Sequence, residues 1–559
     1  MKSEIFHPEL LTTIKSYSRK QLVQDVIAGI IVGIVALPLA IAFGIASGVT
    51  PEKGIITAII AGFIVSFLGG SRVQIGGPTG AFIVIVAGVV SAYGLLGLMI
   101  ATFLAGILLV IMGLLKLGDV IKFMPYPVIV GFTSGIALVI FSTQIKDFFG
   151  LTMSESPVEF HEKWVAYFRH FASLNPYATG IALFTVFVSF FWAKINKLIP
   201  GTLIAIVITT VVVAIFDLPV ETIGSRFGDI EANVPAPAVP SIDFATFRKL
   251  LPVAFTIAML GAIESLLSAM VADGAIGARH RSNTELIAQG VANIVTPLFG
   301  GIPATGAIAR TMTNIKNGGR TPVAGIVHAL VLLLILLIFA RWAKLIPMSC
   351  LAGILVVVSY NMSEWRSFVG IFRNSRSEVA VLLTTFLLTV IFDLTIAIEV
   401  GLILALFLFV RRVSKTTGIQ VIKEKIASGE GEQEILTEEA LNIPKDVDVF
   451  EIDGPFFFGV ANTFEEAQKQ VVKPPRVRII RMRKVPFMDS TGLRNLRSFY
   501  RKCSSEKIHI LLSGVNPSVE TSLKADGLYD IIGADNIFDH ISKAMNRAEE
   551  LVGGERIKN

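Results

Sequence analysis

Charged residues are scarce in this chain. Asp, Glu, Lys and Arg make up 16% of its 559 residues, whereas soluble domains contain about 25%. The sequence has only two cysteines, which excludes a disulfide framework and a cysteine-rich zinc site. Its net charge of +6 is small for this length, which argues against a nucleic-acid-binding protein. What the sequence does have is 53% hydrophobic residues and a mean hydropathy of +0.70. This composition predicts an integral membrane protein.

Apolar stretches follow one another through residues 25–412. Most have about 17 to 25 residues, which is long enough to cross a bilayer as a helix. We expect a transmembrane domain over 25–412, preceded by a cytoplasmic segment at 1–24, and we expect Asp25 to cap the first spanning helix. The expected spans, about fourteen, are 25–47, 52–70, 78–91, 95–115, 124–144, 176–194, 200–217, 250–272, 284–299, 303–314, 321–340, 345–360, 377–393 and 395–411.

The composition changes after residue 412. Residues 413–444 are rich in charge and indicate a linker. Residues 445–552 then alternate short β-like runs with amphipathic stretches, which predicts a small α/β domain. Its expected helices lie in three stretches, at 463–471, 490–503 and 536–552.

Lysine and arginine are distributed unequally between the two sides of the predicted membrane domain. The side that carries the N-terminus receives roughly twice as many as the other, and such an excess marks cytoplasmic loops. An even number of spans then returns the chain to the same side. We therefore expect both termini and the α/β domain to be cytoplasmic.

Two of the expected spans are short, and each follows a Gly/Pro-containing break. The third span follows Gly-Gly-Pro-Thr-Gly-Ala at 76–81, and the tenth follows Gly-Gly-Ile-Pro-Ala-Thr-Gly-Ala at 300–307. The tenth span comes seven after the third, an odd offset, so the two halves of the domain have opposite topology. Paired interruptions of this kind are typical of transporters built from inverted repeats, whose substrate site lies at the breaks.

A helix that begins inside the membrane leaves its first amide groups without intrahelical partners. Those donors, together with the positive end of the helix dipole, favour an anion without a buried lysine or arginine. The sequence therefore predicts an anion site where the two helix starts meet, although a kink in each helix is the plainer alternative. The expected cradle residues are Thr79, Gly80, Ala81, Thr305, Gly306 and Ala307.

Glu264 lies in the middle of the eighth expected span, and Ser268 follows it one helical turn later. A carboxyl group at this depth is costly and usually faces a cavity or a partner. Beside an anion site it suits proton coupling, because protonation removes a like charge; a neutral structural glutamic acid is the alternative. Arg310, one turn beyond the second break, either adds positive potential to the site or anchors the half-helix to lipid headgroups.

These motifs resemble the sulfate permease (SulP) family of anion transporters. The resemblance covers nearly the whole chain, and Phe-Met-Asp-Ser-Thr-Gly-Leu at 487–493 is similar to the central motif of a STAS domain. Gly-Ala-Ile-Glu-Ser-Leu-Leu at 261–267 is similar to the bacterial C4-dicarboxylate branch. Leu39 stands where eukaryotic members often have Gln, which puts simple sulfate specificity in doubt.

The resemblance implies a seven-plus-seven inverted repeat divided into core and gate domains, an elevator-like motion, a homodimer and a bacterial inner membrane location. It also implies that Phe43 lines the substrate site and that Glu264 and Ser268 occupy the proton or cation position, where a glutamate favours protons over sodium. In related soluble STAS domains a serine after the motif Asp is phosphorylated, which here is Ser490. In transporters the domain more often serves assembly and trafficking, with a cytoplasmic protein as partner.

The leading hypothesis is a proton-coupled transporter of a dicarboxylate, sulfate or bicarbonate. The alternatives are an uncoupled anion channel or an exchanger of the same fold, and a signalling protein whose output is the STAS domain. The sequence has no Walker loop, metal-ligand cluster or nucleophile elbow, so we expect no enzymatic activity, no metal and no cofactor.

Overall fold

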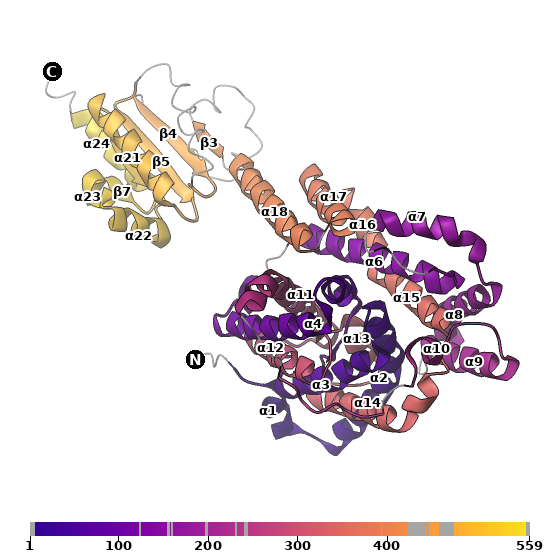
Figure 1. Cartoon of the computed structure of the whole chain (residues 1–559). Helices are drawn as coiled ribbons and strands as arrows, with labels where there is room; N and C mark the ends of the chain where they lie inside the picture. Colours follow the sequence, from indigo (N-terminus) through magenta and orange to yellow (C-terminus); the bar gives the residue numbers. More distant parts are fainter. Residues whose placement is uncertain are drawn as a thin grey trace. The chain divides into compact units, whose positions relative to one another are not determined.

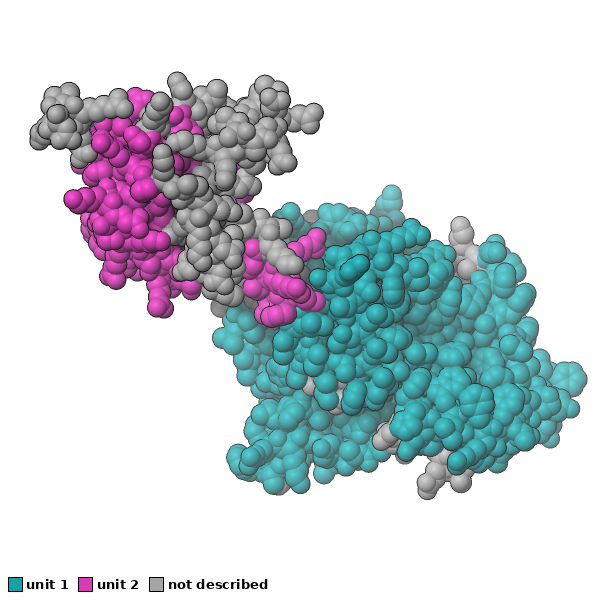
Figure 2. Space-filling model, turned by 90° about the horizontal axis from the view of Figure 1, so that it is seen from above, with its two compact units in different colours: residues 1–405 teal, residues 406–559 magenta. Residues whose placement is uncertain are grey.

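The computed structural model describes residues 6–121, 125–153, 157, 160–195, 200–229, 232–239, 244–392, 394–416, 418–421, 443, 446–457 and 474–554. The chain divides into two compact units, residues 1–405 and 406–559, which Figure 2 shows in different colours. The predicted linker at 413–444 lies largely outside the described residues.

The first unit is almost entirely helical (Figure 1). Each of the fourteen expected ranges overlaps a helix, although 303–307 is not helical and includes the strand Thr305–Gly306. Among the described residues, six helices are long and apolar enough to cross a membrane on their own. Residues Phe160–Ser173 and Pro176–Trp192 qualify only as a pair bent by 118°, and Gly201–Phe216 is a shorter apolar helix. The elements are α1 (Glu9–Thr13), η1 (Ile14–Ser16), α2 (Arg19–Ala46), α3 (Pro51–Leu68), β1 (Gly76–Gly77), η2 (Gly80–Phe82), α4 (Ile83–Leu114), α5 (Gly118–Ile121), α6 (Tyr126–Phe149), α7 (Phe160–His170), η3 (Phe171–Ser173), α8 (Pro176–Ile195), α9 (Gly201–Phe216), α10 (Ile223–Phe227), α11 (Phe244–Ile276), α12 (Ser282–Leu298), β2 (Thr305–Gly306), α13 (Ile308–Lys316), α14 (Pro322–Ala343), α15 (Met348–Met362), α16 (Trp365–Ile371), α17 (Arg376–Ile391) and α18 (Leu394–Thr416).

The helices of this unit pack as two groups. We call α2–α4 and α11–α14 the core group, because these helices pack mainly against one another. We call α6, α8, α9 and α15–α17 the gate group for the same reason. Each group takes helices from both halves of the sequence, as the core and gate division of an inverted repeat requires.

A kink in α4 separates the third expected span from the fourth. Gly94 has non-helical dihedral angles (φ 68°, ψ −174°) inside this helix. A positive φ of this kind is strained for residues with a side chain, and glycine adopts it freely. The third and fourth expected spans are therefore two helical segments of α4 that join at Gly94.

The expected role of Asp25 is wrong. Helix α2 begins at Arg19, six residues earlier, and its N-cap is Ser18, whose hydroxyl accepts a hydrogen bond from Gln21 N. The fully buried Asp25 instead accepts bonds from the Arg320 amide (2.8 Å) and the Thr321 hydroxyl (2.7 Å) at the start of α14. It ties the first helix of one half to a helix of the other.

The second unit is a small α/β domain with a five-stranded sheet in the order β3-β4-β5-β6-β7. Strand β3 pairs antiparallel with β4, and the remaining neighbours are parallel. Apolar clusters cover both faces of the sheet. Its elements are β3 (Gly418–Val421), β4 (Val447–Asp453), β5 (Val477–Lys484), α21 (Ser490–Ser505), β6 (His509–Ser513), α22 (Pro517–Asp526), α23 (Leu528–Ile532), η6 (Ala534–Asn536), β7 (Ile537–Phe538) and α24 (Ile541–Gly554).

Two details of this domain differ from the expectation. The stretch 536–552 begins with strand β7 before helix α24, and β3 lies within the range assigned to the linker. Both strands are short edge strands, whose pattern is too brief to detect in the sequence. The helix expected at 463–471 lies outside the described residues.

Candidate functional site

The two breaks meet in space. Strand β1 of the first break pairs antiparallel with β2 of the second, so that Gly76 faces Gly306 and Gly77 faces Thr305. The helical segment η2–α4 begins just beyond β1, and α13 begins just beyond β2. Two segments more than 200 residues apart thus form one ribbon from which two helices start.

The first break leaves hydrogen-bond donors unused. Among the described residues, the amide groups of Gly80 and Ala81 have no acceptor, because they open the first turn of η2. The Thr79 hydroxyl is buried and has no hydrogen-bond partner there either. Buried polar groups are nearly always paired, so these three donors indicate room for a ligand or water.

The second break uses its equivalent groups differently. The Ala307 amide donates to the Ile75 carbonyl (2.9 Å), and the Gly306 amide donates to the Ser265 hydroxyl (3.1 Å). The amides left without acceptors in the described structure are those of the first turn of α13, at 308–310. Ala309 is exposed although it lies within the core group. The donors of this break therefore lie one turn further along the chain than the sequence predicts.

Thr305 is held by neighbouring helix α11. Its hydroxyl lies 2.6 Å from the Ser265 hydroxyl and donates to the Gly261 carbonyl (3.1 Å). The Gln74 side chain in turn donates to the Ser265 carbonyl (3.2 Å). Ser265 thus connects both breaks with the helix that carries Glu264. Sequence reasoning missed Ser265, because its position beside Glu264 does not show which segment packs against it.

Asn293 on α12 forms hydrogen bonds to the backbone at the start of the second break. Its side-chain amide accepts from the Ala304 N–H (2.9 Å) and donates to the Ala304 carbonyl (2.8 Å). Both groups would otherwise be buried and unpaired, which is costly. Asn293 therefore fixes the backbone just before β2.

The wall of the first break comes from both helix groups. A Cβ atom at Gly80 would lie 3.6 Å from Phe43 Cε1, 3.3 Å from Ile140 Cδ1 and 3.2 Å from Met362 Sδ. Phe43 belongs to α2 of the core group, whereas Ile140 and Met362 belong to α6 and α15 of the gate group. Phe43 thus lies beside Gly80, at the boundary where the two groups meet.

Glu264 and Ser268 lie on α11 behind the ribbon. Glu264 is 8% exposed, and its carboxylate has no hydrogen bond to any described residue. Glu364, which precedes α16, interacts electrostatically with it. The Ser268 hydroxyl donates to Thr311 Oγ1 (3.4 Å) in the first turn of α13. Both predicted coupling residues are thus on the helix that holds the second break.

Arg310 is buried inside the protein. It is 2% exposed, and its guanidinium donates to the carbonyl groups of Gly76 (3.5 Å) and Pro78 in the first break. A side chain at Gly77, where φ is 146°, would collide with it. The arginine therefore links α13 to the opposite break and places a positive charge beneath both helix starts.

Ser490 is the first residue of α21 in the second unit and is exposed. The preceding Asp489 caps this helix, since its carboxylate accepts a bond from the Gly492 amide (2.8 Å). The serine hydroxyl is therefore accessible at a helix N-terminus, where a phosphate would be stabilised. Among the residues that the structure describes, no cluster of His, Cys, Asp and Glu could hold a metal ion.

A profile of the Sulfate permease family matches residues 22–385, and one of the STAS domain matches residues 440–544. The chain is 43% identical over 529 residues to the putative sulfate transporter YvdB of Bacillus subtilis (strain 168), covering 94% of this chain and 98% of that protein. It is 33% identical over 428 residues to the bicarbonate transporter BicA of Picosynechococcus sp. (strain ATCC 27264 / PCC 7002 / PR-6), covering 73% and 74% of the two chains.

Solved structures agree with this relationship. The transmembrane domain of a cyanobacterial bicarbonate transporter BicA superposes with a TM-score of 0.61 at 33% identity, covering 70% of this chain and 98% of that one. The murine anion transporter Slc26a9 in its inward-facing state gives a TM-score of 0.85 at 18% identity, covering 97% and 94%; it supports the fold alone. These relatives are named as transporters and none of them as an enzyme. The chain belongs to the sulfate permease family and carries a STAS domain.

Proposed function

We propose that the chain is a secondary active transporter that holds a small anion between its two breaks. The observation that carries this proposal is the group of unused donors at the first break, which Arg310, in the first turn of α13, contacts through the Gly76 and Pro78 carbonyls. Both helix starts add a partial positive charge of about half a unit each. Arg310 lies behind them with no carboxylate partner among the described residues. The local field therefore favours an anion and opposes a cation.

Backbone amides and a hydroxyl favour an oxyanion as the transported species. Such donors are strongest toward charged acceptors, where each hydrogen bond contributes about 1.5 to 3 kcal/mol. Phe43, Ile140 and Met362 crowd the space beside Gly80, which favours a compact anion over an elongated dicarboxylate. Sulfate and bicarbonate are the first choices, and both are named among the relatives.

Glu264 supplies the proposed coupling to protons. Its carboxylate lies on the helix that holds the second break, and Glu364 is the other carboxylate near it. An ionised Glu264 repels an anion in this poorly solvated site, whereas a protonated one does not. Binding of the anion and of a proton would therefore support each other, so the two would cross together.

The division into core and gate groups supports an elevator-like mechanism. The breaks, Glu264 and Arg310 all belong to the core group, which would move as one body past the gate group. A cavity of about 840 Å³ lies between the groups and is lined by residues of α2, α4, α6 and α15, among others. It includes Ala42 and Ile83, next to the site, and would form the outer access route.

In this proposal the protein is a homodimer in a bacterial inner membrane with both termini in the cytoplasm, and the STAS domain binds a cytoplasmic protein partner.

The test is uptake by purified protein in liposomes. Sulfate, bicarbonate, fumarate and succinate are offered one at a time, with and without an inwardly directed proton gradient. The proposal expects accumulation of sulfate or bicarbonate above the external concentration when the gradient is present. Uptake that only equilibrates the anion under every gradient would indicate a channel, and no uptake of any anion would refute the assignment.

A further inference from the structure

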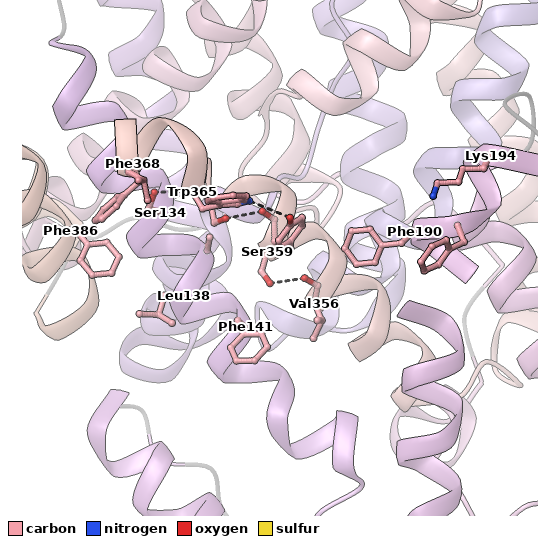
Figure 3. Close-up of a pocket in the computed structure, with 15 residues that line it drawn as sticks. Ser134, Leu138, Phe141, Phe190, Lys194, Val356, Ser359, Trp365, Phe368 and Phe386 are labelled. Carbon is pink, nitrogen blue, oxygen red and sulfur yellow. Dashed lines mark hydrogen bonds between the residues drawn. The ribbon is translucent and has the colours of Figure 1, made fainter. Parts of the chain in front are cut away.

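The gate group carries a second cavity, of about 930 Å³. It is a groove between α6, α8 and α15–α17, and no residue of either break lines it (Figure 3). Aromatic and aliphatic side chains form most of its surface. Those that carry the argument are Leu138, Phe141, Phe190, Phe368 and Phe386.

The hydroxyl groups of the serines that line the groove already donate to backbone carbonyls. The Ser134 hydroxyl donates to the Ser363 carbonyl (2.5 Å), and the Ser359 hydroxyl donates to the Val356 carbonyl (2.8 Å). The interior therefore offers hydrocarbon contact and little hydrogen bonding. Such a lining suits an aliphatic chain and is a poor match for the transported anion.

Two cations lie beside aromatic side chains of the groove. Lys194, which lines it, has its Nζ 5.0 Å above the Phe191 ring, and the guanidinium of Arg366, the neighbour of the lining residue Trp365, lies 5.4 Å from the Trp365 ring. Trp365 Nε1 donates to the Tyr360 hydroxyl (3.2 Å), which leaves the phenolic hydrogen free to bond outward. In Figure 3, Lys194 and Trp365 lie at the same level, above Leu138 and Phe141. Basic residues with Trp and Tyr mark the boundary between hydrocarbon and headgroups.

We propose that this groove binds a phospholipid with an anionic headgroup. Its acyl chains would lie against Leu138, Phe141 and Phe386, and its phosphate would lie near Lys194 at the predicted cytoplasmic boundary. The positive charge of Lys194 at the mouth of the groove favours an anionic over a zwitterionic lipid. The inference rests on the membrane location of the first unit and does not depend on the identity of the transported anion.

The test is native mass spectrometry of the full-length protein in detergent, titrated with phosphatidylglycerol or phosphatidylcholine. We expect one retained phosphatidylglycerol per chain. Lys194→Glu lowers its affinity about fivefold or more, since a single cation near an anionic headgroup contributes about 1 kcal/mol. Leu138→Trp fills the groove and abolishes retention of both lipids, whereas Leu138→Ala keeps it. Lys20→Glu, an exposed charge at the start of α2, and Leu183→Trp, an exposed position on α8, serve as matched controls.

Unchanged retention in Leu138→Trp, with the variant eluting as a folded protein, would overturn the site. Equal affinity for the two lipids would overturn the choice of headgroup, as would an effect of Lys20→Glu as large as that of Lys194→Glu. If no lipid is retained and Leu138→Trp instead dissociates an oligomer, a second copy of the chain is the occupant and the lipid proposal fails. Because lipid retention is measured without uptake, these results are separate from the test of transport.

Discussion

The first break and the second break share the sequence Thr-Gly-Ala, yet the structure uses their polar groups in different ways. Thr79 has a buried hydroxyl without a partner among the described residues, whereas the hydroxyl of Thr305 contacts the Ser265 hydroxyl and donates to the Gly261 carbonyl. The second break is further held by Asn293 at Ala304. One break thus keeps unused donors in the described structure, and the other is mainly anchored to its neighbours. Pseudo-symmetric motifs need not contribute equally to the site that they form.

The largest expected effect on uptake comes from adding a methyl group to the ribbon at Gly306. In Gly306→Ala the new Cβ would lie 1.7 Å from Gln74 Nε2, so the buried Gln74 side chain must move away from the Ser265 carbonyl to which it donates. Overpacking of this kind costs about 1 to 3 kcal/mol or more, and we expect uptake to be lost. The matched control is Gly88→Ala on α4, where nothing lies within 4 Å of the new methyl group. Uptake in both variants is measured in liposomes; normal uptake by Gly306→Ala would show that the packing of Gln74 against the second break is not needed for transport.

Substitution of Thr79 and of Thr305 tests directly whether the two breaks have different roles. Thr79→Val removes a donor to the anion, which costs about 1.5 to 3 kcal/mol, so we expect KM to rise about 10- to 150-fold. Thr305→Val breaks bonds within the protein, so it should lower thermal stability while KM changes much less. KM for the transported anion and Tm are measured for both. A larger KM effect in Thr305→Val than in Thr79→Val would reverse the assigned roles.

Glu264→Gln tests the coupling group. The amide cannot ionise, so uptake should lose its dependence on external pH and the anion should no longer accumulate under a proton gradient. Exchange of internal for external anion should persist. The control is Glu364→Gln, which removes the neighbouring charge and leaves Glu264 able to titrate. Proton-driven accumulation by Glu264→Gln would exclude this residue from coupling.

The smallest effect is expected in the second unit. Ser490→Ala leaves the Asp489 cap intact, so the change in stability should stay within about 0.5 kcal/mol, as for most surface substitutions. Asp489→Ala removes the cap of α21 and should cost about 1 kcal/mol. Hydrogen exchange of the α21 amides in the full-length protein distinguishes them. Equal protection in both variants would show that the cap does not hold this helix.

Much of the fold followed from long-range patterns in the sequence. The apolar stretches predicted the helices of the first unit, and Gly/Pro pairs at 76–78 and 300–303 identified the breaks. The pairing register could not be predicted, because Gly76 and Gly306 meet through tertiary packing alone. The anchoring roles of Ser265 and Asn293 depend on which helix packs against β2, and a serine beside a glutamate does not reveal that. Asp25 was assigned to its own helix because capping is a local rule, and here Arg320 and Thr321 at the start of a distant helix supply donors to it.

The most direct test of the anion site is protection of single cysteines by the transported anion. The two native cysteines are buried, and burial raises the pKa of the Cys503 thiol, so the background reactivity should be low. Thr79→Cys and Thr305→Cys are treated with a charged methanethiosulfonate reagent in liposomes, with and without the transported anion. The account predicts that Thr79→Cys is labelled and that the anion slows its labelling, whereas Thr305→Cys reacts little under either condition. Protection confined to Thr305→Cys, or labelling of Thr79→Cys that the anion does not change, would contradict the account.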